Sequence, residues 1–190
     1  MSGLKYSPRS SSNRTAIGWI LPLALLVCSS TFAGPREQAK RMHDRLTGVP
    51  PTAEKLDEMV TAINSNDFIG AARLAIEHPD FYNVTLKNWV TPWTNRERDA
   101  FAPLNDFTAT VIGMIRDDKP FNTVLSADIV YIAPGVTPAY SNSSNAHYQQ
   151  IEQLGLNLKD VLESRAQSDK TINHVPSEYA AAGVVTTRAA

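Results

Sequence analysis

A single cysteine, Cys28, is the feature that most limits how this chain of 190 residues can be stabilised. Cys28 lies in a segment that we expect to be removed, so the mature protein would contain no thiol. Disulfides, thiolate metal sites and cysteine nucleophiles would then be excluded. The fold must therefore rest on a hydrophobic core, and residues 34–190 are long enough to form one domain around such a core.

The first 33 residues have the pattern of an export signal. Lys5, Arg9 and Arg14 precede an apolar run over residues 16–28, and small and polar residues follow up to Gly34. We place the cleavage after Ala33, because Thr31 and Ala33 fit the small-residue rule of such sites. The apolar run is shorter than the roughly 20 residues that a spanning helix needs. The sequence predicts a periplasmic or secreted protein, which would contact a membrane only through an uncleaved signal.

The charge balance excludes one class of partner. The chain has 18 basic and 19 acidic residues, and three of the basic ones lie in the signal, which leaves 15 against 19 in the mature chain. These charges are scattered along the sequence. We therefore expect no nucleic-acid partner, since such partners require clustered positive charge.

Helical spacing of apolar residues dominates the mature chain. One helix should be capped by Thr52 and place Leu56, Met59, Val60 and Ile63 on one face. The other expected helices cover residues 36–46, 68–77, 81–90, 104–115, 124–132 and 148–165. We predict an all-α single domain of about six or seven short helices with a long Pro/Ser/Asn loop. Its parts would be a helical core domain over 34–132, the loop at 133–146, and a C-terminal helical segment and tail over 147–190.

Several residues should set the ends and faces of these helices. Gly48 should stop the first helix, and Asp67 and Asp80 should cap the third and fourth. We expect Ile69, Ala72, Leu74 and Ile76 to face inward. Residues 129–132 could equally be extended, because three of them are β-branched and one is aromatic.

No catalytic motif is recognisable in the sequence. The four histidines, His43, His78, His147 and His174, lack metal-ligand spacing, and we expect them at the surface. Asp117 and Asp118 should lie solvated in a turn. Asp128 interrupts an apolar run, so it should pair with Arg116, Lys119 or a backbone amide.

Two tryptophans, Trp89 and Trp93, stand four residues apart in a polar stretch that ends at Arg96. We favour their interpretation as core anchors where a helix meets a turn. The alternative is an aromatic platform for a ligand or a partner domain. The candidate binding or docking residues are Trp89, Trp93, Arg96, Arg116 and Asp128.

Four short stretches occur in an order that carries a family resemblance. They are Arg45-Leu-Thr-Gly-Val-Pro-Pro-Thr52, His78-Pro-Asp-Phe-Tyr82, residues 116–128 and residues 182–187. In this order they resemble segments of the planctomycete-type periplasmic cytochrome-associated proteins, which contain domains of unknown function often joined to c-type haem modules. The resemblance implies a periplasmic, mostly helical domain associated with electron transfer.

The resemblance has one clear departure, because this chain contains no C-x-x-C-H sequence. Covalent haem attachment therefore needs a partner or a missing C-terminal part, and the chain looks like the helical front half of a haem protein. We expect no cofactor in this chain, no catalysis of its own, and a scaffold or docking role toward a c-type cytochrome. The alternatives are a periplasmic hydrolase that uses Asp128, Arg116 and the tryptophan region, and a carbohydrate or small-ligand binder that uses the tryptophans.

Overall fold

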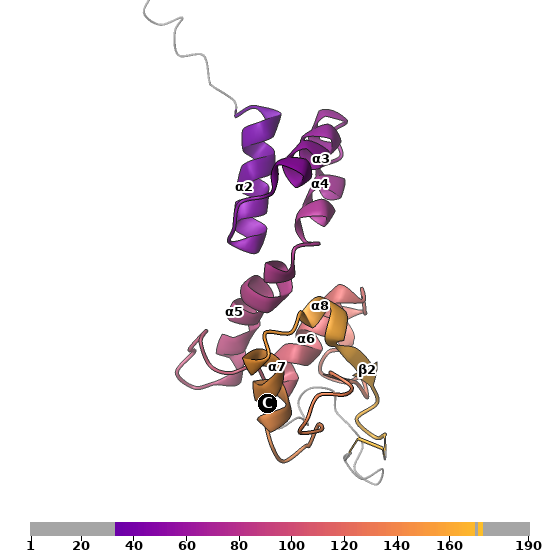
Figure 1. The fold of residues 1–190 in the computed structure, drawn as a ribbon. Helices are drawn as coiled ribbons and strands as arrows, with labels where there is room; N and C mark the ends of the chain where they lie inside the picture. Colours follow the sequence, from indigo (N-terminus) through magenta and orange to yellow (C-terminus); the bar gives the residue numbers. More distant parts are fainter. Residues whose placement is uncertain (1–32, 170, 173–190) are drawn as a thin grey trace, which may run out of the picture. The chain divides into compact units, whose positions relative to one another are not determined.

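The computed structural model describes residues 33–169 and 171–172, and these are mostly helical with one small sheet (Figure 1). The expectation of a mostly helical fold is confirmed, and the all-α class holds only roughly because two short strands pair. The predicted export segment, apart from Ala33, and the tail from residue 173 lie outside the described residues. The elements are α2 (Pro35–Thr47), α3 (Ala53–Asn64), α4 (Phe68–Ala75), η2 (Phe81–Leu86), α5 (Lys87–Val90), η3 (Thr91–Thr94), α6 (Asp106–Arg116), η4 (Phe121–Thr123), β1 (Val130–Ile132), α7 (Ala146–Gln153), α8 (Leu158–Val161) and β2 (Glu163–Arg165).

Helices α2 and α3 begin and end close to where the sequence predicts, and α4 begins at the predicted Phe68 but ends at Ala75, before the predicted end at residue 77. Gly48 has a left-handed φ of 78° and its N–H donates to the Asp44 carbonyl, which closes α2. The Thr52 hydroxyl accepts a hydrogen bond from the Lys55 N–H, and the Asp67 carboxylate accepts one from the Gly70 N–H. Both residues therefore act as the N-caps that the sequence indicates.

These three helices pack around their own apolar cluster. Its buried members are Ala39, Leu56, Met59, Ile63, Ala71 and Ala75. The inward face that we expected for α4 is wrong for Ile69, which is 70% exposed, whereas Leu74 does pack, partly buried, against the cluster. Ala71 and Ala75 are fully buried. Small side chains at these two positions let the backbones of α3 and α4 approach closely.

Residues 81–94 form one run of helix with three geometries in succession. The π-helix η2 leads into α5, and the 3-10 helix η3 follows. The predicted helix over 81–90 is confirmed in its location. Asp80 does not cap it, since the Asp80 side chain makes no capping hydrogen bond there.

A second apolar cluster surrounds α6 and β1. Its largest buried side chains include Tyr131, Tyr148 and Met114. β1 lies so close to α6 that a Cβ on Gly113 would stand 2.1 Å from the Tyr131 ring. The Tyr131 N–H donates to the Thr110 hydroxyl at 3.1 Å, and the Tyr148 hydroxyl donates to the Tyr131 carbonyl at 2.8 Å. Glycine at 113 is therefore what allows the strand to lie on this helix.

The chain after α6 departs most from the predicted helices. Residues 130–132 are extended and pair antiparallel with β2, with Val130 opposite Arg165. A helix over 124–132 is therefore wrong, and the extended alternative is correct. The predicted helix over 148–165 is also wrong as one piece, because Gly155 with φ 61° separates α7 from α8. Residues 133–145 form the predicted loop, with a single β-bridge between Ser141 and Ser144.

Among the described residues, the helices are all too short or too polar to cross a membrane.

Candidate functional site

The two tryptophans lie on α5 and η3 and are exposed. Trp89 is 53% and Trp93 is 52% exposed, and their rings meet edge to face with centroids 4.9 Å apart. The core-anchor interpretation is therefore wrong, because the neighbouring Leu86 and Val90 occupy the core instead. Apolar residues four apart occur on both faces of this helix, so spacing alone does not tell which pair is buried.

Trp89 also lines a shallow hollow with a volume of about 290 Å³ beside the end of α6. We call this hollow together with Trp93 the aromatic groove. Phe121 is 44% exposed at its edge, and Asp118 and Lys119 supply one charge of each sign. The residues that line the hollow are Trp89, Met114, Ile115, Asp118, Lys119 and Phe121. An apolar patch with mixed charges at its rim suits contact with another macromolecule.

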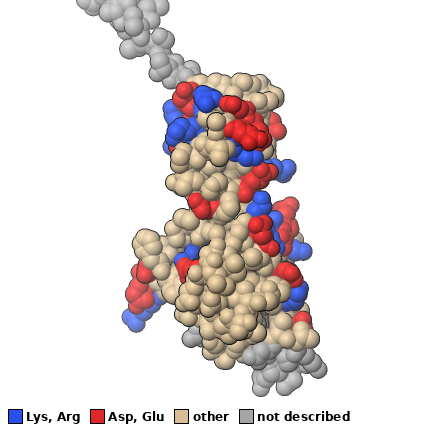
Figure 2. Space-filling model, in the orientation of Figure 1, with Lys and Arg blue, Asp and Glu red and all other residues tan. Residues whose placement is uncertain are grey.

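Arg96 lies beyond the tryptophans in the loop before α6. Its side chain is exposed and makes no hydrogen bond or ion pair with the described residues. In Figure 2, basic and acidic residues lie side by side in the upper part of the molecule and along its flanks, and a wide area lower on this face carries none. Arg96 is thus available at the surface, but it does not line the aromatic groove.

Arg116 is engaged in a network that ties α6 to the end of the fold. Its Nη1 donates to the Lys159 carbonyl at 2.8 Å and to the Leu162 carbonyl at 2.7 Å. Its Nε and Nη2 donate to the two carboxylate oxygens of Asp117 at 2.6 and 3.0 Å, and the Tyr131 hydroxyl donates to Asp117 at 2.7 Å. Asp117 is therefore hydrogen-bonded to Arg116 and Tyr131, and it is also partly exposed to solvent. The Arg116 hydrogen bonds lower the pKa of Asp117, against a smaller opposing effect of burial.

Asp128 finds its partner in the backbone, one of the three options that its position suggests. Its carboxylate accepts hydrogen bonds from the Ser168 N–H at 3.0 Å and from the Ser168 hydroxyl. Arg116 and Asp128 therefore use their polar atoms in separate networks. Arg116 holds α8 and the residue before β2, and Asp128 holds the segment after β2.

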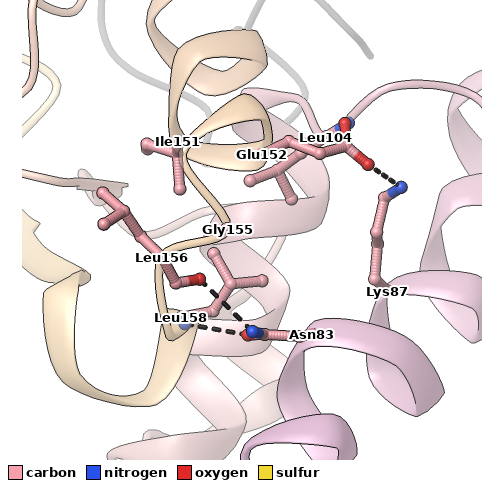
Figure 3. Close-up of a pocket in the computed structure, with 8 residues that line it drawn as sticks. All are labelled: Asn83, Lys87, Leu104, Ile151, Glu152, Gly155, Leu156 and Leu158. Carbon is pink, nitrogen blue, oxygen red and sulfur yellow. Dashed lines mark hydrogen bonds and ion pairs between the residues drawn. The ribbon is translucent and has the colours of Figure 1, made fainter.

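A second cavity, missed in the sequence, lies between η2, α5 and the α7–α8 connection (Figure 3). Its volume is about 150 Å³ and its walls are mainly leucine and isoleucine side chains. Lys87 pairs with Glu152 at one side, and the Asn83 amide bonds the Leu156 carbonyl and the Leu158 N–H at the other. Its lining residues Asn83 and Leu158 are 75 positions apart in the chain, so no local sequence pattern predicts the cavity.

The histidines differ from the surface positions that we expected. His43 and His147 are almost fully buried, which makes the prediction wrong for both, and His78 is partly exposed. His174 lies outside the described residues. Where the structure describes the chain, no three His, Cys, Asp or Glu side chains are grouped as a metal site would require.

Comparisons with protein-family models, with curated proteins and with solved structures found no match for this chain. Its function is therefore argued from the residues themselves.

Proposed function

We propose that the mature chain is an exported docking domain without catalysis of its own, and that its aromatic groove binds a periplasmic c-type cytochrome module. The proposal rests on two independent grounds. The signal-like segment and the order of the four family-like stretches support export and the kind of partner. The exposed tryptophans support the mode of binding.

The half-exposed tryptophan pair is the observation that carries the proposal. A tryptophan buries about 150–250 Å² when it is fully covered, so each ring here keeps roughly 100 Å² in water. Covering that area would contribute about 2–3 kcal/mol per ring. Tryptophans that become buried at the centre of an interface commonly supply most of its binding energy.

The helix end that bears the tryptophans is fixed before any partner arrives. The Thr94 hydroxyl donates to the Thr91 carbonyl at 2.7 Å, and the Asn95 amide donates to the same carbonyl at 3.0 Å. Little conformational entropy is then lost on binding, which favours a useful affinity from a small apolar contact.

The hydrolase alternative has less support. It requires Arg116 and Asp128 to act on a substrate together, yet each is bonded within its own structural network. The alternative in which the tryptophans bind a carbohydrate or another small ligand would use the same surface. The tryptophan variants described next therefore test this alternative too.

Calorimetric titration of residues 34–190 with a purified c-type cytochrome domain of the protein group that the sequence resembles tests the proposal. Trp89→Ala and Trp93→Ala should each weaken binding by about tenfold or more, since each removes an interface anchor. Phe101→Ala is the matched control, because Phe101 is 85% exposed and lies outside the groove. Absence of binding, or equal losses for all three variants, would contradict the proposal.

The same preparation tests whether haem belongs to the partner. The mature chain expressed with a haem-maturation system should show no Soret absorption, because it lacks the two thiols that attach haem c. A Soret band that copurifies with the chain would overturn this part of the proposal.

A further inference from the structure

A hollow of about 340 Å³ lies where the end of η3, the segment before α6 and the start of α7 meet. We call it the carboxamide hollow, because four of its lining side chains are amides. Its polar lining residues are Thr94, Asn95, Asn105, Asn145 and Gln149, and Ala102 and Pro103 complete the wall. None of these side chains carries a charge.

Three of the amides are held in place by the fold. Asn105 accepts from the Thr108 N–H as the N-cap of α6, and it donates to the Thr94 hydroxyl, both at 2.9 Å. The Asn95 amide bonds the Thr91 and Asp99 backbones. Asn145 donates to the Leu104 carbonyl at 2.8 Å. The hollow therefore has a fixed polar lining, as pre-organised binding sites do.

Hydrogen-bonding capacity remains unused at the open side. Gln149 is exposed, and its side chain makes no hydrogen bond within the described ranges. Among the described residues, the Asn145 side chain bonds only through its Nδ2, so its Oδ1 can still accept. A carboxamide offers both a donor and an acceptor, and hydroxyl groups of a ligand need both.

The surroundings select a neutral ligand. An anion would find no cation in the lining, and a cation would find no carboxylate. On the face shown in Figure 2, a wide area without charged side chains covers the region where Figure 1 places α7. Peptides are usually recognised by a sheet edge, an apolar groove or charged pockets, whereas the lining here is neutral and polar.

We propose that the carboxamide hollow binds a neutral saccharide, such as a short segment of a glycan chain. Each sugar hydroxyl can donate and accept, which matches the Gln149 amide and the Asn145 carbonyl oxygen. A volume of about 340 Å³ is at the lower end of the range for ligand pockets, which suits a small number of sugar rings. This site is separate from the aromatic groove, so the proposal does not rest on the docking function.

Nuclear magnetic resonance of the ¹⁵N-labelled mature chain tests the proposal with three probes, which are maltotriose, cellotriose and triacetylchitotriose. At least one probe should shift the side-chain amide signals of Asn145 and Gln149 in a saturable manner. Gln149→Ala should weaken that binding by about threefold to tenfold, the equivalent of a lost hydrogen bond. Gln153→Ala is the matched control, because Gln153 is an exposed glutamine on the same helix and does not line the hollow.

Because the exposed Gln149 side chain bonds to nothing in the part of the chain that the structure describes, its replacement should leave folding intact and keep the test decisive. Failure of all three trisaccharides to shift these amides would overturn the proposal. So would binding that Gln149→Ala leaves unchanged, or shifts confined to the indole signals of Trp89 and Trp93. Trp93→Ala should leave saccharide binding intact while it weakens docking, which separates failure of one proposal from failure of the other.

Discussion

Arg116 holds three parts of the chain through one guanidinium group. It chelates the carboxylate of its neighbour Asp117 and donates to the carbonyls of Lys159 and Leu162. Its carbon Cζ also lies 5.7 Å from the centre of the Tyr131 ring. The planar guanidinium group carries several N–H donors that reach the carboxylate and both carbonyls at once, which the ammonium group of a lysine cannot do.

Arg116→Lys should therefore destabilise the protein by about 1–3 kcal/mol, although the charge is conserved, because carbonyls in a partly buried site lose their donors. Urea unfolding followed by circular dichroism measures the change. Arg73→Lys on the exposed face of α4 is the control, and it should change stability by less than about 0.5 kcal/mol. Equal effects of the two substitutions would show that the network contributes nothing specific.

At the scale of elements, the sequence predicts best where a helix end is decided by one residue. Gly48, Thr52 and Asp67 each satisfy backbone groups by local geometry, so their roles can be inferred without knowledge of the fold. The strand at 130–132 is different. Its three residues are all buried because β1 lies on α6 and pairs with β2, and those contacts come from distant parts of the chain.

In the candidate sites, too, the residue types can be recognised locally, whereas their exposure and their convergence depend on distant parts of the chain. Trp89 and Trp93 stand out in the sequence as residue types, but their exposure depends on which face of their helix packs into the fold, and here Leu86 and Val90 do. The carboxamide hollow brings together residues 94–105 and 145–149, and each of its asparagines alone looks like an ordinary cap or turn residue. No local pattern predicts such a convergence.

Gly48→Ala tests whether the left-handed residue that ends α2 contributes to stability. No atom lies within 4 Å of the added Cβ, so the whole effect should come from the left-handed backbone at φ 78°. We expect a loss of about 1–2 kcal/mol in the free energy of unfolding. Gly48→Asn should lose less, since asparagine tolerates this conformation better. If alanine and asparagine cost the same, or neither costs anything, the left-handed cap does not stabilise α2.

At the scale of the whole molecule, His147 links α7 to the long loop. Its Nδ1–H donates to the Pro138 carbonyl at 2.9 Å, and its Nε2 accepts from the Ala133 N–H at 3.1 Å. The rings of Tyr140 and Tyr148 pack against it. This arrangement requires the neutral ring, because a second proton on Nε2 would displace the Ala133 hydrogen bond. Burial accordingly lowers the pKa of His147 below the ordinary 6.5.

The folded protein should therefore lose stability in mild acid. Because the His147 pKa is lower in the folded state, the unfolded chain binds more protons below about pH 6.5, so stability is full above that value and falls as the pH decreases. The slope from this group can reach about 1.4 kcal/mol per pH unit. Urea unfolding between about pH 7.5 and pH 5 should show this slope, and His147→Gln should reduce it. Equal slopes for both proteins, or a His147 ring that titrates at or above its ordinary pKa by nuclear magnetic resonance, would contradict the assignment.

Asp117, whose pKa Arg116 holds below 3.8, should add a second loss of stability only at still lower pH, so the effects of the two groups separate along the titration.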